Sequence, residues 1–189
     1  MNQLAWSKMT GKMDGIPALN TDTTTNKFCI AKSKDANSIC SKCYSWNMLK
    51  TFRKNAVPRF QLNSKLLSEK VLDFNELPRP NSNTARFNAH GELINTNHVQ
   101  NLVNYALFYP KVTFTLWTKK KGLIQSFFNK CDKPKNLLLI YSNETLELIP
   151  DIIKGGAEQS INGPDNTPLM GEDGNEIKLS LDDILNIPV

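Results

Sequence analysis

The sequence of 189 residues has the length of one domain, or of one domain with a small appendage. Hydrophobic residues make up 40% and charged residues 22%, as in chains that bury a core. No apolar run approaches the roughly 18 residues of a membrane helix, residues 1–10 lack a signal-peptide core, and four cysteines are too few for a disulfide scaffold. We therefore expect a cytoplasmic protein and exclude membrane-embedded and secreted ones.

Charge is divided unevenly along the chain. Residues 1–135 carry 21 of the 23 lysines and arginines and 8 acidic residues, whereas residues 136–189 carry 2 basic and 10 acidic residues. Such a basic body could bind a polyanion, or the two halves could attract each other in the fold. Only Lys119-Lys120-Lys121 forms a run of basic residues, so both interpretations stay open.

The first part of the chain predicts irregular structure and then helices. Residues 1–28 are rich in turn-forming residues. Apolar residues spaced by three after Tyr44 predict a helix that Pro58 interrupts, and a second helix is expected to follow and to end near residues 77–80.

From residue 85 the pattern alternates between strands and helices. Branched and aromatic residues mark the strands, and single apolar stripes mark the helices. The predicted strands are Ala85–His90, Val112–Trp117 and Leu137–Tyr141, and the predicted helices are Asn97–Phe108 (capped by Asn95 or Thr96), Lys119–Lys130 and Leu146–Ile153. This alternation is typical of an α/β fold with a parallel sheet.

The last residues differ from the alternating part. Gly171-Glu172-Asp173-Gly174 separates the apolar stretches 169–170 and 177–179 and predicts a β-hairpin. We therefore expect a domain at 1–156, with a cysteine loop and the α/β elements, and a small hairpin appendage at 157–189 packed on it.

Polar residues follow all three predicted strands. They read His90-Gly91-Glu92, Thr118-Lys119 and Ser142-Asn143-Glu144. Parallel α/β folds bind ligands at the carboxyl ends of their strands, so we expect these residues to share a cleft. Ordinary loop polarity also explains each of them taken alone.

Three cysteines upstream carry the most specific signal. Cys29, Cys40 and Cys43 have the spacing C-x10-C-x2-C and are followed by Tyr44. Two thiolates at C-x2-C spacing can bind one metal site, and a third cysteine completes three ligands. Neighbouring lysines are expected to lower the pKa of these thiols. The pattern predicts a metal or iron–sulfur site rather than three free cysteines.

The sequence is compatible with two kinds of metal site, a structural zinc site and an iron–sulfur cluster. A structural zinc needs four protein ligands. Cys131 is expected at the amino ends of the strands and His98 on a helix surface, which leaves His90 as the candidate fourth ligand. A [4Fe–4S] cluster on three cysteines would instead keep one iron open, an arrangement associated with S-adenosylmethionine.

A series of motifs follows the first cysteine: C-x-x-C-Y, a strand ending in a small residue and an acid, a helix ending in proline, a strand reading T-F-x-x-x-T-K, and a strand ending in serine. The residues that match are Cys40–Tyr44, Gly91-Glu92, Pro110, Thr113–Lys119, and Ser142 near Glu144. In this order, over about residues 8–145, the chain resembles the phage gene-product-88-like family. It is similar, more loosely, to phage three-cysteine proteins related to radical S-adenosylmethionine enzymes.

The resemblance implies a partial (β/α) barrel with a [4Fe–4S] cluster on Cys29, Cys40 and Cys43. The implied cofactor-binding residues are Tyr44, Gly91, Glu92, Thr118, Lys119 and Ser142. Glu92 with Gly91 would hold the amino group of S-adenosylmethionine, and Tyr44 would contact its adenine side. Reductive cleavage of the cofactor would give a radical that acts on a nucleotide, nucleic acid or protein, so the resemblance favours an enzyme.

The alternative is a non-enzymatic phage protein in the cytoplasm of an infected or lysogenic host cell. A zinc or iron–sulfur site would then only staple the loop 29–43, and the basic surface would bind nucleic acid or a host protein. The residues for such binding are Lys119–Lys121, Lys130, Lys133 and Lys135, with the aromatic Trp46, Phe52 and Phe60 near Arg53, Lys54 and Arg59. The spacing of these aromatic residues equally predicts helix packing.

Overall fold

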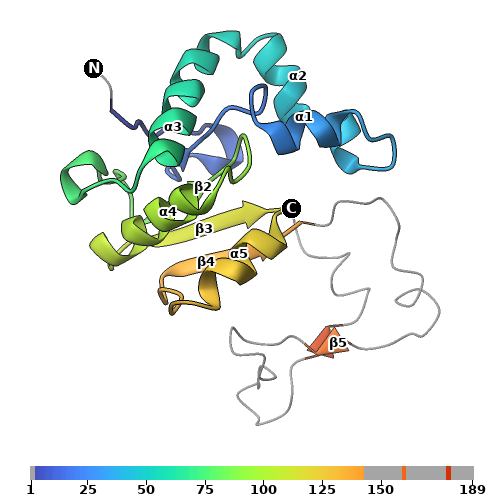
Figure 1. Ribbon diagram of the computed structural model, residues 1–189. Helices are drawn as coiled ribbons and strands as arrows, with labels where there is room; N and C mark the ends of the chain where they lie inside the picture. The colour runs from blue at the N-terminus through green and yellow to red at the C-terminus, as the bar shows by residue number, and fades with distance from the viewer. Residues whose placement is uncertain (1–2, 143–158, 161–177, 180–189) are drawn as a thin grey trace. The chain divides into compact units, whose positions relative to one another are not determined.

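The computed structural model describes residues 3–142, 159–160 and 178–179. The chain divides into two compact units, Met1–Leu146 and Glu147–Val189, and each is described by itself. The first unit contains the sheet and all of the described helices (Figure 1).

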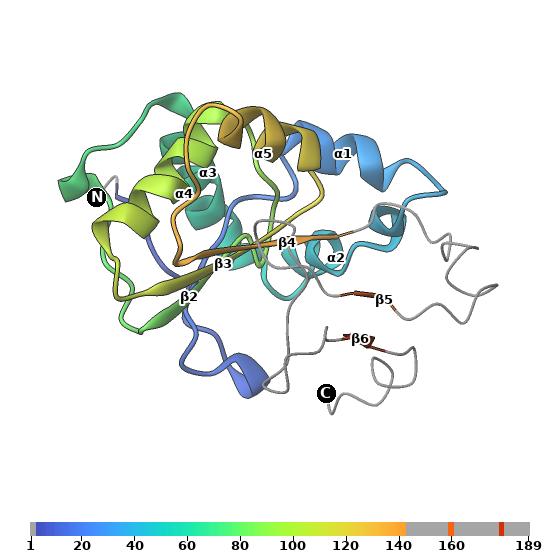
Figure 2. The same ribbon diagram turned by 90° about the horizontal axis from the view of Figure 1, so that it is seen from below.

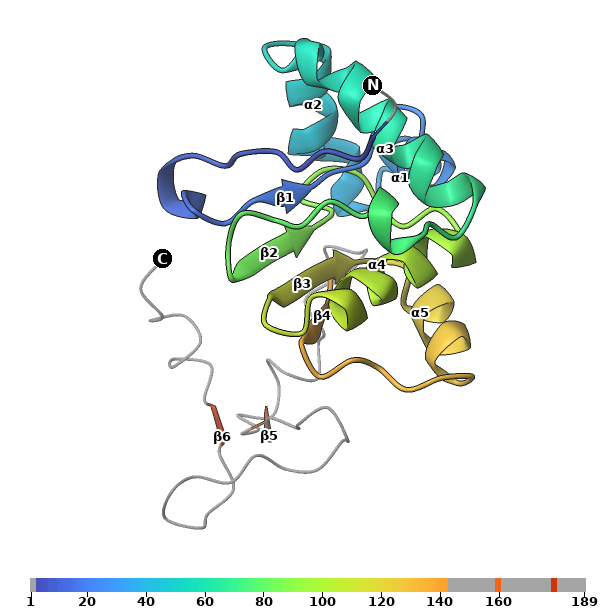
Figure 3. The ribbon, with the colours of Figure 1, turned by 90° about the vertical axis from the view of Figure 1, so that its left-hand side faces the viewer.

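The first unit is built on a four-stranded sheet in which every pair of neighbouring strands is parallel. The strands are β1 (Ala18–Leu19), β2 (Thr84–Phe87), β3 (Thr113–Thr118) and β4 (Leu137–Tyr141). They lie in the order β1-β2-β3-β4, as Figure 3 shows from the side. The predicted α/β fold with a parallel sheet is confirmed, and the described sheet is open.

Single helices connect the later strands. α4 (Thr96–Phe108) joins β2 to β3, and α5 (Lys121–Phe128) joins β3 to β4. Asn95 caps α4 as predicted, because its side chain accepts a hydrogen bond from the backbone N–H of His98 at 3.0 Å. α4 and α5 pack together on the same side of the sheet (Figure 2).

The connection from β1 to β2 is long and carries the cysteines. It contains α1 (Lys27–Ser33), α2 (Tyr44–Lys50) and α3 (Val57–Glu69). Pro58 lies in the first turn of α3, where its missing N–H costs nothing, so it begins this helix. Four short 3₁₀ segments complete the described unit: Gly11–Met13, Ile39–Lys42, Lys54–Ala56 and Phe74–Glu76.

The core lies between the sheet and α4. Phe87 of β2 stacks on Phe114 of β3 with ring centroids 4.9 Å apart, and Tyr105 of α4 contacts both rings. Trp6 covers this group from the N-terminal segment and donates to the carbonyl of Pro78 at 2.7 Å. Alternate residues of β2 face the other way, so Arg86 points away from the core that Phe87 enters.

Three sequence expectations need correction. The segment 1–28 contains β1, a strand too short to show an alternating pattern. His98 is fully buried rather than on a helix surface. The second predicted helix is α3, which ends at Glu69 and not near residues 77–80, because the backbone of Lys70 is extended. In the second unit β6 (Lys178–Leu179) pairs antiparallel with β5 (Gln159–Ser160).

Other expectations fall beyond what is described. The predicted helix at 146–153 and the stretch 169–170 lie outside the described residues. The division at residue 156, and the packing of the C-terminal part on the first, stay predictions. In the described part of the chain, none of the helices has the length and apolar character needed to cross a membrane.

Candidate functional site

A cavity of about 300 Å³ lies at the carboxyl ends of β2, β3 and β4. Its lining residues come from α1, the 3₁₀ segment Ile39–Lys42 and α2 on one side and from the strand ends on the other. All of the site residues predicted from the sequence line it: Cys29, Cys40, Cys43, Tyr44, Gly91, Glu92, Thr118, Lys119 and Ser142. Of the strand-end residues expected to share a cleft, Gly91, Glu92, Thr118, Lys119 and Ser142 line this cavity, His90 does not, and residues 143–144 lie outside the described residues.

Local hydrogen bonds hold the cysteines in place. Asn26 caps α1 by accepting from the N–H groups of Phe28 and Cys29, and its amide donates to the carbonyl of Glu92 at 2.9 Å. The Ser38 hydroxyl accepts from the N–H of Cys40 at 3.2 Å, and Cys43 precedes the first residue of α2. The cysteine segment is thereby tied to the loop after β2.

The Cys29 thiol lies in an environment that disfavours its charged form. Burial, followed by the negative charges of Glu92, Cys43 and Cys40, raises the pKa of Cys29 from 9.0 to about 12. The expected lowering of this pKa by nearby lysines is therefore wrong for Cys29, and only Lys119 acts in that direction.

The three thiols supply the donor type that iron–sulfur clusters and zinc prefer. Within the described residues, no three His, Cys, Asp or Glu side chains lie close enough together to hold one metal ion. The cavity thus offers three candidate ligands on one wall, without a preassembled single-ion site.

Glu92 is buried, and its hydrogen bonds connect the loop after β2 to the end of β3. One carboxylate oxygen, Oε1, accepts from the Leu93 N–H at 2.7 Å and the Thr118 hydroxyl at 2.6 Å, and Oε2 accepts from the Lys119 N–H at 2.8 Å. Burial raises the pKa of Glu92, while these hydrogen bonds act against the rise. Because a carboxylate offers about four acceptor positions, one on Oε2 is left for a further donor.

Gly91 lines the cavity, and the backbone explains why the residue is glycine. Its φ is 82°, and a Cβ atom at this position would collide with the side chain of Thr21 and lie 2.5 Å from the Thr21 carbonyl oxygen. Its N–H donates to the Thr23 hydroxyl at 3.0 Å. Gly91 therefore allows the β2 loop to pass directly over the end of β1.

Tyr44 and Ser142 complete the predicted set. The Tyr44 hydroxyl donates to the carbonyl of Ala89 at 2.7 Å, and its ring lies beside that of His90. Burial is the main cause of a raised pKa of Tyr44. Ser142 follows β4, where its N–H donates to the Thr118 carbonyl at 3.0 Å.

The remaining metal-ligating side chains lie elsewhere. His90 does not line the cavity, because its Nδ1 pairs with the Ser45 hydroxyl at 2.8 Å and its ring contacts Phe60. Burial, with the charges of Arg53 and Arg86, lowers the pKa of His90 to about 4. Cys131 is exposed beyond α5 and lines a different cavity, consistent with its expected place at the amino ends of the strands.

The sequence analysis missed seven residues of this cavity: Thr23, Phe28, Ser45, Arg86, Asn88, Ala89 and Trp117. Arg86, Asn88 and Trp117 lie on the face of the sheet that points away from the core, because Arg86 is in register with Thr115, two residues before Trp117. The sequence contains one signal for two of them: the polar Arg86 and Asn88 alternate with the apolar Ala85 and Phe87, as residues on opposite faces of a strand do.

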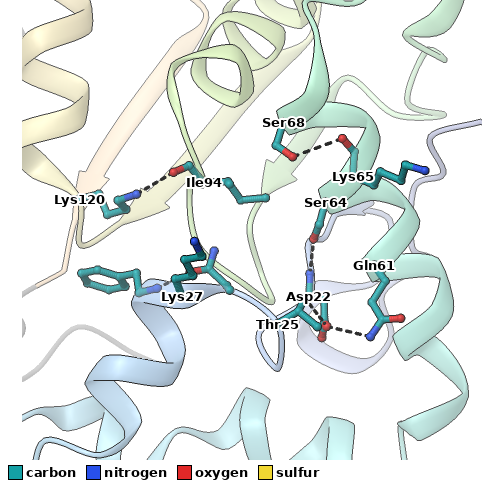
Figure 4. Close-up of a pocket in the computed structure, with 11 residues that line it drawn as sticks. Asp22, Thr25, Lys27, Gln61, Ser64, Lys65, Ser68, Ile94 and Lys120 are labelled. Carbon is teal, nitrogen blue, oxygen red and sulfur yellow. Dashed lines mark hydrogen bonds between the residues drawn. The ribbon is translucent and has the colours of Figure 1, made fainter.

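A second cavity of about 530 Å³ lies between α3 and the start of α1 (Figure 4). Its most buried polar residue is Asp22, whose carboxylate accepts from Thr24, Thr25 and Gln61. Lys120 reaches across to the carbonyl of Ile94 at 3.0 Å. These internal hydrogen bonds join three parts of the chain, so Asp22 and Lys120 already have partners.

The fold and the cavity define an α/β protein with a cysteine-lined cavity at the carboxyl ends of a parallel sheet. Residues 5–169 match the family described as Gene product 88. The chain belongs to this family, which confirms the resemblance to phage gene-product-88-like proteins. No curated protein and no solved structure matches the chain.

Proposed function

We propose that this chain is an iron–sulfur protein in which Cys29, Cys40 and Cys43 bind a [4Fe–4S] cluster and leave one iron open for S-adenosylmethionine. The observation that carries the proposal is the meeting of three thiols with the Glu92 carboxylate in one cavity. Three thiolates leave one iron of such a cluster without a protein ligand. The reaction would be of the radical type, on a nucleotide, nucleic acid or protein.

The residues around the cysteines suit this role. The free acceptor position on Glu92 Oε2 would receive the amino group of the cofactor, and Thr118 and Lys119 hold that carboxylate in place. Tyr44, next to the last cysteine, would contact the adenine side. The bound cluster would supply the electron for reductive cleavage, and Cys29 would have to release its proton when the metal binds.

The test is S-adenosylmethionine binding and cleavage by anaerobically prepared protein with a reductant. Glu92→Gln should keep its iron but bind S-adenosylmethionine about tenfold more weakly or worse, because a hydrogen bond to a charged partner is lost. Glu69→Gln makes the same change on the exposed surface of α3 and should bind like the wild type. Equal affinity of the Glu92 variant, measured by calorimetry, would remove Glu92 from the site.

A non-enzymatic nucleic-acid-binding protein is a second candidate, and the surface near α2 favours it. Phe52 is 76% exposed beside Arg53 and Lys54, and the Lys50 ammonium lies 4.4 Å from the centroid of the Trp46 ring. Exposed aromatic and basic side chains together suit single-stranded nucleic acid. Phe60, by contrast, is buried in the packing of α3.

Two of the lysines expected to bind nucleic acid are less available for such binding. Lys120 donates to the carbonyls of Leu93 and Ile94, and Lys133 donates to those of Pro134 and Leu137. For the second candidate, binding of single-stranded DNA should fall steeply with salt and weaken in Phe52→Ala. Binding that Phe52→Ala leaves unchanged would exclude this surface.

A further inference from the structure

Two polar side chains of the cavity come from the same face of the β2 region. Ala85 and Phe87 enter the core, whereas Arg86 and Asn88 alternate with them and line the cavity. Asn88 is 6% exposed, so its amide is shielded from solvent.

Both side chains keep a buried donor without a partner. Arg86 Nε and Asn88 Nδ2 are buried and make no hydrogen bond, with the Asn88 amide oriented so that its oxygen accepts from the Thr21 hydroxyl at 3.5 Å. Among the described residues, the other unpaired buried atoms are His98 Nε2 and Tyr105 Oη. Neither of these residues lines the cysteine cavity. Unpaired buried donors are costly, so two that line one cavity point to a ligand.

The backbone of Asn88 is held in an unfavourable conformation. Its φ of 55° makes it the one non-glycine residue in the left-handed region among the described residues. Its N–H donates to the carbonyl of Leu19 at 3.0 Å, which fixes the strained residue at the end of β2. Strain of this kind is concentrated at functional sites.

The guanidinium group of Arg86 is held in position and has no ion-pair partner among the described residues. It lies over the ring of Trp117, with Cζ 5.3 Å from the ring centroid. Lys119 adds a second positive charge to the cavity wall, whereas the Glu92 carboxylate is already hydrogen-bonded.

We propose that Arg86 and Asn88 form a subsite for an oxyanion, the phosphate or carboxylate group of a small molecule bound in the cysteine-lined cavity. A guanidinium fork matches the geometry of both groups, and the Asn88 amide adds a neutral donor beside it. The inference deepens the proposed function and rests on it for the reaction that follows binding. The subsite itself depends only on the donors that line the cavity.

The experiment follows the side-chain ¹⁵N resonances of the full-length protein during titration with inorganic phosphate or with acetate. The Arg86 Nε and Asn88 Nδ2 signals should shift saturably, and the signal of the exposed Arg59 should not. Saturation by phosphate alone assigns the subsite to phosphorylated molecules, and saturation by acetate alone assigns it to carboxylates. The absence of a saturable shift with both anions overturns the proposal.

Two substitutions separate binding from folding. Arg86→Lys keeps the charge but loses the Nε donor, and it should bind the anion at least tenfold more weakly, whereas Arg59→Lys should bind like the wild type. Asn88→Gly removes the amide and also relieves the strained φ, so it should be at least as stable as the wild type but bind more weakly. Wild-type affinity in both cavity variants would contradict the subsite.

The titration is run on samples with and without bound iron, so that the two proposals can fail separately. Anion binding by protein that takes up no cluster supports the subsite while the proposed function fails. A protein that binds the cluster but shows no saturable anion shift overturns the subsite alone.

Discussion

At Gly91 the backbone has a φ of 82° and passes so close to Thr21 that a methyl group has no room. Gly91→Ala should therefore lower the free energy of unfolding by about 2–4 kcal/mol, from backbone strain together with the collision. Gly122→Ala in α5 is the matched control, because no atom lies within 4 Å of the added methyl group. That control should lose no stability and gain up to about 1 kcal/mol. Urea denaturation compares the two variants, and equal stabilities would contradict this account of Gly91.

The Cys29 thiol gives the metal-free protein a dependence on alkaline pH. Its pKa is about 12 in the folded protein and 9.0 as the ordinary value, so the folded state holds this proton more tightly than the unfolded chain. The contribution of the protonated Cys29 thiol to the free energy of unfolding is fully present below pH 9. It is lost as the pH rises toward 12, at about 1.4 kcal/mol per pH unit. In Cys29→Ser the free energy of unfolding should therefore fall less steeply over this pH range than in the wild type.

Denaturation of the reduced, metal-free protein between pH 9 and 10.5 measures the slope. Cys131→Ser serves as the control, because Cys131 is exposed and should leave the wild-type slope unchanged. Identical slopes for the wild type and Cys29→Ser would show that the thiol is not buried as described.

Five of the predicted cavity residues follow from one rule, that the carboxyl ends of parallel strands meet at one edge. Gly91-Glu92, Thr118-Lys119 and Ser142 could be placed together on that basis. Arg86 and Asn88 could not, because only the register of β2 with its neighbours shows which face of the strand lines the cavity. The strained φ of Asn88 likewise has no signal in the sequence.

At the scale of elements, the start of α4 depends on a buried neutral histidine. His98 Nδ1 accepts from the Ile94 N–H at 3.2 Å, which holds the loop after β2 against the first turn of the helix. Burial and the charge of Lys120 lower the pKa of His98 to about 3, and the pKa of His90 falls to about 4. Both values lie below the ordinary 6.5, so the unfolded chain binds these protons more readily.

The stability that these two histidines contribute is present above pH 6.5 and is lost as the pH falls through 4 and 3. Each contributes about 1.4 kcal/mol per pH unit in that interval. His98→Gln removes one of these two contributions. Between pH 6.5 and 4, the free energy of unfolding of this variant should therefore change by about 1.4 kcal/mol per pH unit less than that of the wild type, whatever the stability of the variant at neutral pH. Urea denaturation at several pH values measures this slope, and an unchanged slope would mean that His98 is not buried in its neutral form.

Elements with a strong local pattern were predictable, and the exception has a physical cause. The predicted strand Leu137–Tyr141 coincides with β4, and the apolar stripe and cap at Asn95 predict α4. β1 was missed because it has two residues, and its pairing with β2 depends on segments more than sixty residues apart in the sequence. No local pattern records a contact of that range.

At the scale of the whole molecule, the long connection between β1 and β2 is what creates the cavity. It carries all three cysteines over the carboxyl ends of the strands, whereas the shorter connections carry α4 and α5 along one face. The uneven charge was visible in the sequence.

The most direct test of the central claim is the iron, sulfide and zinc content of protein produced and purified without oxygen. The proposed site predicts about four irons and four sulfides per chain, which Cys40→Ala loses and Cys131→Ala keeps. One zinc per chain without iron, or full iron content in Cys40→Ala, would contradict it.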